Sequence, residues 1–255
     1  MNEFSEKVAL ITGASRGIGE ATAYEFSRQG ITVLLAARSA DRLKAITEII
    51  RSRGGRAESI ICDVSSSEDV KRAVLLAVEQ YGRLDILVNN AGIIEPIHRL
   101  EDSEPDAWSG VIDTNLKGVY YGIRYAAPVM AEQGRGTIIN ISSGAATSAL
   151  EGWSHYCASK AGVLSLTRCA DKEFREKGVT VIGLSPGTVA TDMQLAIRQS
   201  GINPVSRLAS DRHIPAAWAA QAVLWLCSPA AKHLAGSDFS LKSDDNRALV
   251  GLVPG

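Results

Sequence analysis

The chain has 255 residues, of which 45% are hydrophobic and 22% are charged, and its formal net charge is −1. This near-neutral balance gives no electrostatic reason to expect nucleic acid or an anionic membrane as a partner. The polar start of the chain and the shortness of its apolar runs predict neither a secretion signal nor a membrane anchor. We therefore expect a cytoplasmic globular protein.

Cysteine and histidine are few and scattered. Without a CxxC pair, the cysteines are expected to be small buried hydrophobes in a reducing compartment. The histidines lack metal-ligand spacing, so no metal site is expected. The residues are Cys62, Cys157, Cys169 and Cys227, and His98, His155, His213 and His233.

Short β-branched runs alternate with longer helical stretches along the chain. Strands are expected at Val8–Thr12, Ile31–Ala37, Arg56–Cys62, Leu84–Asn89, Thr137–Ser142, Thr180–Ser185 and Phe239–Leu241. Helices are expected over 17–29, over a stretch with Leu43, Ile46 and Ile50 on one face, from a capping box at Ser65 and Glu68 to Tyr81, and over about 104–131 and 154–176.

The pattern predicts an α/β fold. Strands such as Val8–Thr12 are almost wholly apolar, as parallel strands covered on both faces must be. Right-handed βαβ units then give a doubly wound, mainly parallel, Rossmann-like sheet in three αβα layers. No linker or repeat divides the chain, so residues 1–255 are expected to form one domain with both cofactor and catalytic sites. The irregular stretch 186–214 is a candidate mobile lid.

A glycine-rich turn follows the first strand. Its sequence, Thr12-Gly13-Ala14-Ser15-Arg16-Gly17-Ile18-Gly19, lets the backbone approach a pyrophosphate without a Cβ in the way. The helix that begins near Gly17 directs free N–H groups at that anion. We expect cofactor contacts from Gly13, Ser15, Arg16, Gly17, Ile18 and Gly19.

The residue at the end of the second strand bears on the choice of dinucleotide. A site for NAD places an acidic residue there to bind the ribose 2′-hydroxyl. This chain has Arg38 instead, which with Arg16 suits the 2′-phosphate of NADP(H). The alternative is that Arg38 is only a solvated helix-entry residue and that Asp41 reaches the ribose.

Together with motifs farther along, these features resemble the short-chain dehydrogenase/reductase family, from about Lys7 to about Gly236. The matching motifs are Thr12–Gly19, Asp63, Asn89-Asn90-Ala91-Gly92, Asn115, Ser143, Tyr156-Cys157-Ala158-Ser159-Lys160 and Pro186-Gly187 through Thr191. The resemblance implies an oxidoreductase that binds NADP(H) and interconverts a ketone or aldehyde and an alcohol. It also implies a homo-oligomer, a tetramer or a dimer, that acts on a small molecule.

The resemblance also assigns roles to single positions. Asp63 and Val64 would bind the adenine, and Asn90, Ala91 and Gly92 would lie against the ribose. Pro186, Gly187, Val189 and Thr191 would hold the nicotinamide carboxamide. For these segments the alternatives are strand-end turns and an ordinary proline turn.

Tyr156 and Lys160 are four residues apart in a predicted helix, so their side chains share one face. A free phenol has a pKa near 10, and a neighbouring ammonium is expected to lower it. Ser143, at the end of the fifth strand, can hydrogen-bond the substrate oxygen. Ser142 is a competing candidate, and the family interval selects Ser143. By the resemblance, Tyr156 is the acid/base, Lys160 also holds the nicotinamide ribose, and Asn115 completes the group by supporting a proton path toward Lys160.

The substrate pocket is expected to be partly apolar. Trp153 has the alternative role of a core residue that covers the active-site helix. Two other readings stay open for the whole chain, an NADP-binding sensor without turnover and an epimerase or dehydratase on the same fold. The expected pocket residues are Ile94, Leu150, Trp153, His155, Met193 and Leu195.

The C-terminal segment departs from the family pattern. Where the family has a Val-Asp-Gly-Gly-like ending, this chain reads Gly236-Ser237-Asp238-Phe239-Ser240-Leu241-Lys242. This leaves open how residues 237–255 contribute to the pocket wall and to subunit contacts. The apolar run 249–253 suggests that the tail packs on a neighbouring subunit.

Overall fold

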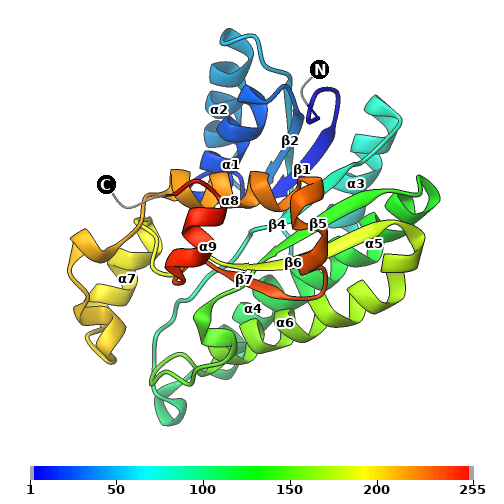
Figure 1. Cartoon of the computed structure of the whole chain (residues 1–255). Coiled ribbons are helices and arrows are strands. Elements are labelled where there is room, and N and C mark those ends of the chain that lie inside the picture. The colour runs from blue at the N-terminus through cyan, green and yellow to red at the C-terminus, as the bar shows by residue number, and fades with distance from the viewer. Residues whose placement is uncertain (1–2, 253–255) are drawn as a thin grey trace.

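A computed structural model describes residues 3–252, and its centre is a single seven-stranded parallel sheet (Figure 1). The strand order is β3-β2-β1-β4-β5-β6-β7. The order reverses between β1 and β4, which is the switch point where doubly wound sheets bind ligands. The strands are β1 (Val8–Thr12), β2 (Thr32–Ala37), β3 (Ala57–Ile61), β4 (Ile86–Asn89), β5 (Gly136–Ile141), β6 (Val179–Ser185) and β7 (Asp238–Ser240).

Helices cover both faces of the sheet, as the apolar strands require. Successive side chains of β1 enter opposite cores: Ala9 and Ile11 pack in one hydrophobic layer, Val8 and Leu10 in the other. The first layer includes residues of α1 (Gly17–Arg28), α2 (Ala40–Ser52) and α8 (Ala216–Leu226). The second includes residues of α3 (Ser67–Tyr81), α5 (Gly118–Glu132) and α6 (Ser154–Phe174). The predicted doubly wound αβα fold is confirmed.

The expected helix over 104–131 is interrupted. It consists of α4 (Pro105–Ile112), a π-helical turn at Asp113–Lys117, and α5. Asn115 lies in this turn, where its side chain accepts from Ile93 N and donates to Ile93 O, both at 2.8 Å. Such a turn widens the helix locally and is common at functional sites.

Two further expectations need correction. Ser66, not Ser65, caps α3 by accepting from Asp69 N, because Ser65 is held in a turn by the Asp63 carboxylate. The stretch 186–214 is also not wholly irregular. It contains α7 (Asp192–Ser200), shown in yellow at the left of Figure 1, and two short 3₁₀ turns.

The C-terminal segment folds back onto its own chain. Val250 and Leu252 are 4% and 3% exposed in the core layer that contains α8, and Gln221 on α8 donates to Val250 O at 2.9 Å. The expectation that this apolar run covers a neighbouring subunit is therefore wrong for Val250 and Leu252, whereas Leu249, at the end of α9 (Asp244–Leu249), is 56% exposed. Residue 253 lies outside the described residues.

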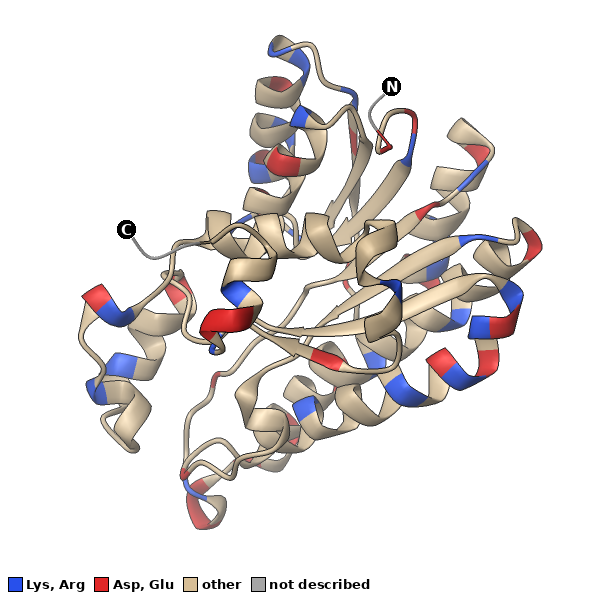
Figure 2. Ribbon diagram, viewed as in Figure 1, with Lys and Arg blue, Asp and Glu red and all other residues tan. Residues whose placement is uncertain are grey.

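The surface is of mixed charge. Figure 2 shows basic and acidic residues interspersed along the outer helices, in keeping with the net charge of −1. No helix within residues 3–252 is both long and apolar enough to cross a membrane. The cysteines divide: Cys62 and Cys227 are buried, whereas Cys169 is exposed, so the expectation of burial is wrong for Cys169.

Candidate active site

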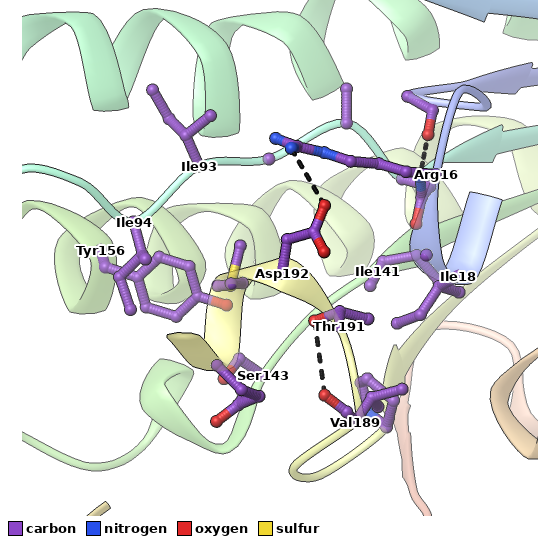
Figure 3. Close-up of a pocket in the computed structure, with 18 of the residues that line it drawn as sticks. Arg16, Ile18, Ile93, Ile94, Ile141, Ser143, Tyr156, Val189, Thr191 and Asp192 are labelled. Atoms are coloured by element: carbon purple, nitrogen blue, oxygen red, sulfur yellow. Dashed lines mark hydrogen bonds and ion pairs between the residues drawn. The ribbon is translucent and has the colours of Figure 1, made fainter. Parts of the chain in front are cut away.

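A cavity of about 990 Å³ opens at the carboxyl ends of the strands, where loops from both halves of the sheet meet. Arg16 and Ile18 lie at one end, and Tyr156 and Ile94 at the other (Figure 3). The cavity is therefore long enough to receive an extended ligand that runs from the glycine loop to the α6 tyrosine. All but one of the predicted cofactor residues line it. These are Gly13, Ser15, Arg16, Gly17, Ile18, Arg38, Asp63, Val64, Asn90, Ala91, Gly92, Tyr156, Lys160, Pro186, Gly187, Val189 and Thr191.

The glycine loop leaves no room for a side chain at Gly13 and Gly19. Gly13 has φ +64°, and a Cβ there would lie 2.8 Å from Ala91 Cα. Gly19 is the exception among the predicted cofactor residues, because it lies behind the cavity, where a Cβ would be 2.5 Å from Gly13 O. Asn90 Nδ2 holds the loop by donating to Thr12 O at 2.9 Å. At Gly13 and Gly17 the loop therefore presents bare main chain to the cavity.

The start of α1 faces this loop. In the described part of the chain no side chain caps the helix at Arg16, so the first backbone N–H groups remain available to an anion. Thr191, which begins α7, closes the opposite side: a Cβ on Gly17 would lie 3.2 Å from Thr191 Cγ2. This cradle fits a dinucleotide pyrophosphate.

Basic residues gather at the end of the cavity where adenosine is expected. Arg16 pairs with Asp192 at 3.4 Å, and Arg38 and Arg42 line the wall. Burial raises the pKa of Asp63, but hydrogen bonds from Ser65 and the nearby Arg38 charge outweigh it, so the pKa is lowered. Arg38 therefore lies close to the expected adenine-binding carboxylate. Asp41, the alternative ribose ligand, is exposed on α2 and is absent from the cavity lining.

Tyr156, Ser143 and Lys160 meet at the other end. Tyr156 and Lys160 are 8% and 4% exposed, one turn apart on α6, with Lys160 Nζ 5.6 Å from the centre of the Tyr156 ring. Ser143 hydrogen-bonds the Tyr156 hydroxyl, and both line the cavity. Lys160 Nζ donates to Ile141 O at 2.7 Å, which fixes the amine beneath the cavity floor.

Burial dominates the ionisation of this group. It raises the pKa of Tyr156 to about 12, against the smaller opposing effect of the Ser143 hydrogen bond. Burial also lowers the pKa of Lys160 to about 8, although the negative charge of Asp238 opposes the change. The expected lowering of the Tyr156 pKa is therefore wrong for this arrangement, because the desolvation of the phenol outweighs the opposing Ser143 hydrogen bond.

Asn115 supports the group from behind. It is fully buried in the π-helical turn and does not line the cavity. Its Nδ2 also donates to Ser159 Oγ at 3.3 Å, and Ser159 Oγ donates to Tyr156 O. Asn115 thereby connects the loop after β4 to the helix that carries the tyrosine.

Apolar side chains line the cavity beside Tyr156. Trp153 packs edge-on against the Tyr156 ring at 5.6 Å between centroids and is 5% exposed, so it belongs both to a small core and to the cavity wall. Four of the predicted pocket residues line the cavity, namely Ile94, Leu150, Trp153 and Met193.

His155 and Leu195 were predicted wrongly as pocket residues. The His155 ring is buried between Pro96 O and Tyr156 N, to which it hydrogen-bonds, and burial lowers its pKa. It helps to position the start of α6. Leu195 is 59% exposed on α7, on the side away from the cavity lining. Helical spacing could not show which side of α7 faces inward.

Sequence reasoning missed Asp238 and Lys242. Asp238 Oδ2 accepts from Ser185 at 2.7 Å and from Ser142 at 3.3 Å, so Ser142 is turned away from the role left open for it. Burial raises the pKa of Asp238, although the serines and the charge of Lys160 oppose this. Lys242 lines the cavity. The one signal for both was the unusual sequence after Gly236.

Metal-ligating side chains do not cluster here. Residues 3–252 contain no group of three or more His, Cys, Asp or Glu placed to hold a metal ion.

The profile of the short chain dehydrogenase family matches residues 7–201. The chain belongs to the short-chain dehydrogenase family. Its resemblance to this family is thereby confirmed, and it is an oxidoreductase that acts on C=O or CH–OH groups.

Relatives of known activity cover nearly the whole chain. Cyclohexanol dehydrogenase of Acinetobacter sp. (strain SE19) is 33% identical over 241 residues, 93% of this chain and 94% of the relative. The 3-oxoacyl-[acyl-carrier-protein] reductase FabG of Staphylococcus aureus (strain Mu50 / ATCC 700699) is 37% identical over 239 residues, 90% of this chain and 94% of the relative.

Solved structures share this fold. Levodione reductase superimposes with a TM-score of 0.89 at 26% identity, covering 96% of this chain and 100% of the other. A variant of actinorhodin polyketide ketoreductase with NADPH superimposes with a TM-score of 0.86 at 28% identity, covering 94% and 97%. The short-chain dehydrogenase fold of this chain is therefore closely matched over most of its length.

Proposed function

We propose that this short-chain dehydrogenase is an NADP(H)-dependent ketoreductase in which Tyr156 is the proton donor. The observation that carries the proposal is the single cavity with a bare glycine cradle and Arg38 at one end, and Tyr156, Ser143 and Lys160 at the other. FabG and a ketoreductase described with NADPH are among the similar proteins. Both names favour the reduction of a ketone, and the second favours the same cofactor here.

Several residues would hold NADPH. The cradle from Gly13 to Ile18 would bind the pyrophosphate, Arg38 and Arg16 the 2′-phosphate, and Asp63 and Val64 the adenine. Asn90, Ala91 and Gly92 would lie along the ribose, and Pro186, Gly187, Val189 and Thr191 beside the carboxamide. Bound NADPH supplies the hydride that reduces a carbonyl carbon.

The residues of the chain supply the proton and its control. The Tyr156 hydroxyl, with a pKa of about 12, is protonated at neutral pH and donates to the carbonyl oxygen, which becomes the alcohol hydroxyl. Ser143 hydrogen-bonds the same oxygen and stabilises the charge that develops there. Lys160, still largely protonated at neutral pH, stabilises the phenolate that remains. Alcohol oxidation reverses these roles.

The decisive test is a panel of ketones, aldehydes and secondary alcohols followed by absorbance at 340 nm with NADPH, NADH and their oxidised forms. Wild type should oxidise NADPH with a ketone, and Tyr156→Phe should lose about 10²–10⁴-fold in kcat while it still binds NADPH. No net absorbance change with any substrate would instead favour a sensor or an epimerase. Retained turnover by Tyr156→Phe would reject the proton donor.

We also propose that the chain acts in the cytoplasm as a homo-oligomer, a tetramer or a dimer. Exposed apolar side chains on neighbouring helices, Leu75 of α3 at 43% and Tyr120 of α5 at 47%, favour a partner surface. Cysteines without paired spacing favour a reducing compartment. Light scattering coupled to size-exclusion chromatography measures the mass, and a monomer at micromolar concentration would contradict the assembly.

A further inference from the structure

Lys242 follows the last strand and extends into the cavity beside the catalytic serine. A Cβ on Gly144, the residue after Ser143, would lie 3.1 Å from Lys242 Nζ. Farther back along the same side chain, Lys242 Cγ would lie 3.7 Å from a Cβ on Gly187. The lysine thus lies across the loops that follow β5 and β6, with its ammonium at the Ser143 side.

The backbone that carries Lys242 is held in place. Leu241 N donates to Ser185 O at 3.0 Å, and Lys242 N donates to Ser240 Oγ at 3.3 Å. From α9, Asn246 Nδ2 donates to Ser240 O at 2.9 Å and Arg247 Nε donates to Leu241 O at 2.6 Å. The backbone at the end of β7 is therefore fixed, and the ammonium can move only through changes in the Lys242 side-chain rotamer.

Lys242 is exposed, and its charge is not matched by any carboxylate in the described part of the chain. Among residues 3–252, no carboxylate lies within 4.0 Å of Lys242 Nζ. Two of the carboxylates that line the cavity are engaged elsewhere: Asp192 with Arg16 and Asp63 with Ser65. The other two, Glu20 and Glu95, also lie outside that distance. An unmatched ammonium in a concave site attracts an anionic ligand group.

We propose that Lys242 determines substrate specificity by pairing with a carboxylate of the substrate, which is then a short oxo acid. This inference rests on the proposed ketoreductase function. The carbonyl oxygen would lie at Ser143 and Tyr156, and the carboxylate one residue farther along, at Gly144, where the Lys242 ammonium lies. The apolar wall of Ile94, Leu150 and Trp153 would receive the hydrocarbon part of the molecule.

The test compares acids with their neutral esters. Wild type, Lys242→Gln and Lys242→Arg are assayed with 2-oxohexanoate, 4-oxopentanoate and their methyl esters. Loss of one charged hydrogen bond is worth about 1.5–3 kcal/mol, so Lys242→Gln should lower kcat/KM for the preferred acid about 10–100-fold and leave its ester within about twofold. Lys242→Arg should keep the preference for the acid.

The matched control is Lys172→Gln, an exposed lysine of α6 outside the cavity lining, which should change neither substrate class. The proposal would be overturned if Lys242→Gln lowered kcat/KM equally for acid and ester, or lowered it for neither. It would also be overturned if Lys242→Arg lost the preference for the acid as Lys242→Gln does. A changed oligomeric mass in Lys242→Gln with unchanged acid preference would also overturn it, because Lys242 would then serve a subunit contact.

A binding measurement separates this proposal from the proposed function. Calorimetric titration of the NADP⁺-loaded protein with hexanoate and with hexanamide needs no turnover. Hexanoate should bind more tightly than hexanamide, and Lys242→Gln should remove about 10-fold or more of that difference. If wild type and Lys242→Gln bound hexanoate equally well, Lys242 would not be the carboxylate-binding residue, even if the protein reduces ketones. Normal carboxylate binding without any ketone reduction would reject the function alone.

Discussion

The two ends of the cavity differ in how far their ionisable side chains are exposed to solvent. At the adenosine end, the Arg16 and Asp192 side chains are 60% and 59% exposed, and their 3.4 Å pair lies in solvent. At the catalytic end, Lys160 and Tyr156 are 4% and 8% exposed, and burial shifts both pKa values. The same cavity therefore contains a solvated recognition site and a desolvated chemical site.

This difference explains which residues can do chemistry. A solvated guanidinium recognises a phosphate through charge and shape. A buried amine whose pKa is about 8 changes its charge near neutral pH, so its neighbours control it. Substitutions at the buried end should therefore alter rate and pH dependence, and those at the solvated end should alter cofactor choice and salt dependence.

After the loss of the Tyr156 hydroxyl, the largest effect is expected at Ser143. Ser143→Ala removes the hydroxyl that bonds the reacting oxygen, so kcat for ketone reduction should fall about 10²–10³-fold with a smaller change in KM. Ser142→Ala is the matched control, because the Ser142 hydroxyl is directed at Asp238. Both variants are assayed by NADPH oxidation at 340 nm. Equal losses of kcat in the two variants would contradict the specific role of Ser143.

Arg38→Asp tests the solvated end. It should raise the Kd for NADPH about 10–100-fold by removing a charged contact to the 2′-phosphate, and should leave NADH within about twofold. Lys44→Asp, a control on the exposed face of α2, the helix that follows Arg38, lies outside the cavity lining and should leave both Kd values unchanged. Equal losses for NADPH and NADH in a fluorescence titration would contradict the 2′-phosphate role.

Lys160 should make stability depend on pH. Its pKa is about 8 in the folded protein and 10.5 when unperturbed, so the unfolded chain binds more protons between these values and stability rises with pH there. From pH 7.5 to pH 9.5, the thermal midpoint of wild type should therefore rise by about 2–4 °C or more relative to that of Lys160→Met. A constant difference between the two proteins would show that the amine is not desolvated.

The smallest effect is expected for Asp192→Asn. An exposed ion pair contributes about 0–1 kcal/mol, so the thermal midpoint should move by less than about 4 °C. NADPH should bind up to about fivefold more tightly, because Arg16 is released and a negative charge near the phosphates is removed. The gain should shrink at high salt. A tighter complex that does not depend on salt would indicate a packing effect instead.

The features that could be predicted from the sequence are those determined by a few neighbouring residues. Apolar strands such as β1, the glycine turn and the Tyr156–Lys160 spacing each report their surroundings within a few residues, and all were placed correctly. Gly19 shows the limit of this reasoning. A glycine is needed there, because a Cβ would clash with Gly13 O, but Gly19 does not line the cavity as predicted.

The rest depended on contacts between distant segments. Whether His155 faces the pocket or Pro96 O is decided by the packing of the loop after β4 against α6, which helical spacing does not encode. The interruption at Asn115 similarly depends on its bonds to Ile93. Lys242 and Asp238 lie in the segment that departs from the family pattern, so no motif could assign them a role.

The central claim is that one extended cofactor spans both ends of the cavity, and a crystal structure of the protein with NADPH tests it most directly. Our account predicts the 2′-phosphate beside Arg38, the pyrophosphate on the main chain of the Gly13–Ile18 turn, and the nicotinamide ring against Tyr156. A 2′-phosphate directed into solvent away from Arg38, or a nicotinamide ring that does not reach the Tyr156 hydroxyl, would contradict it.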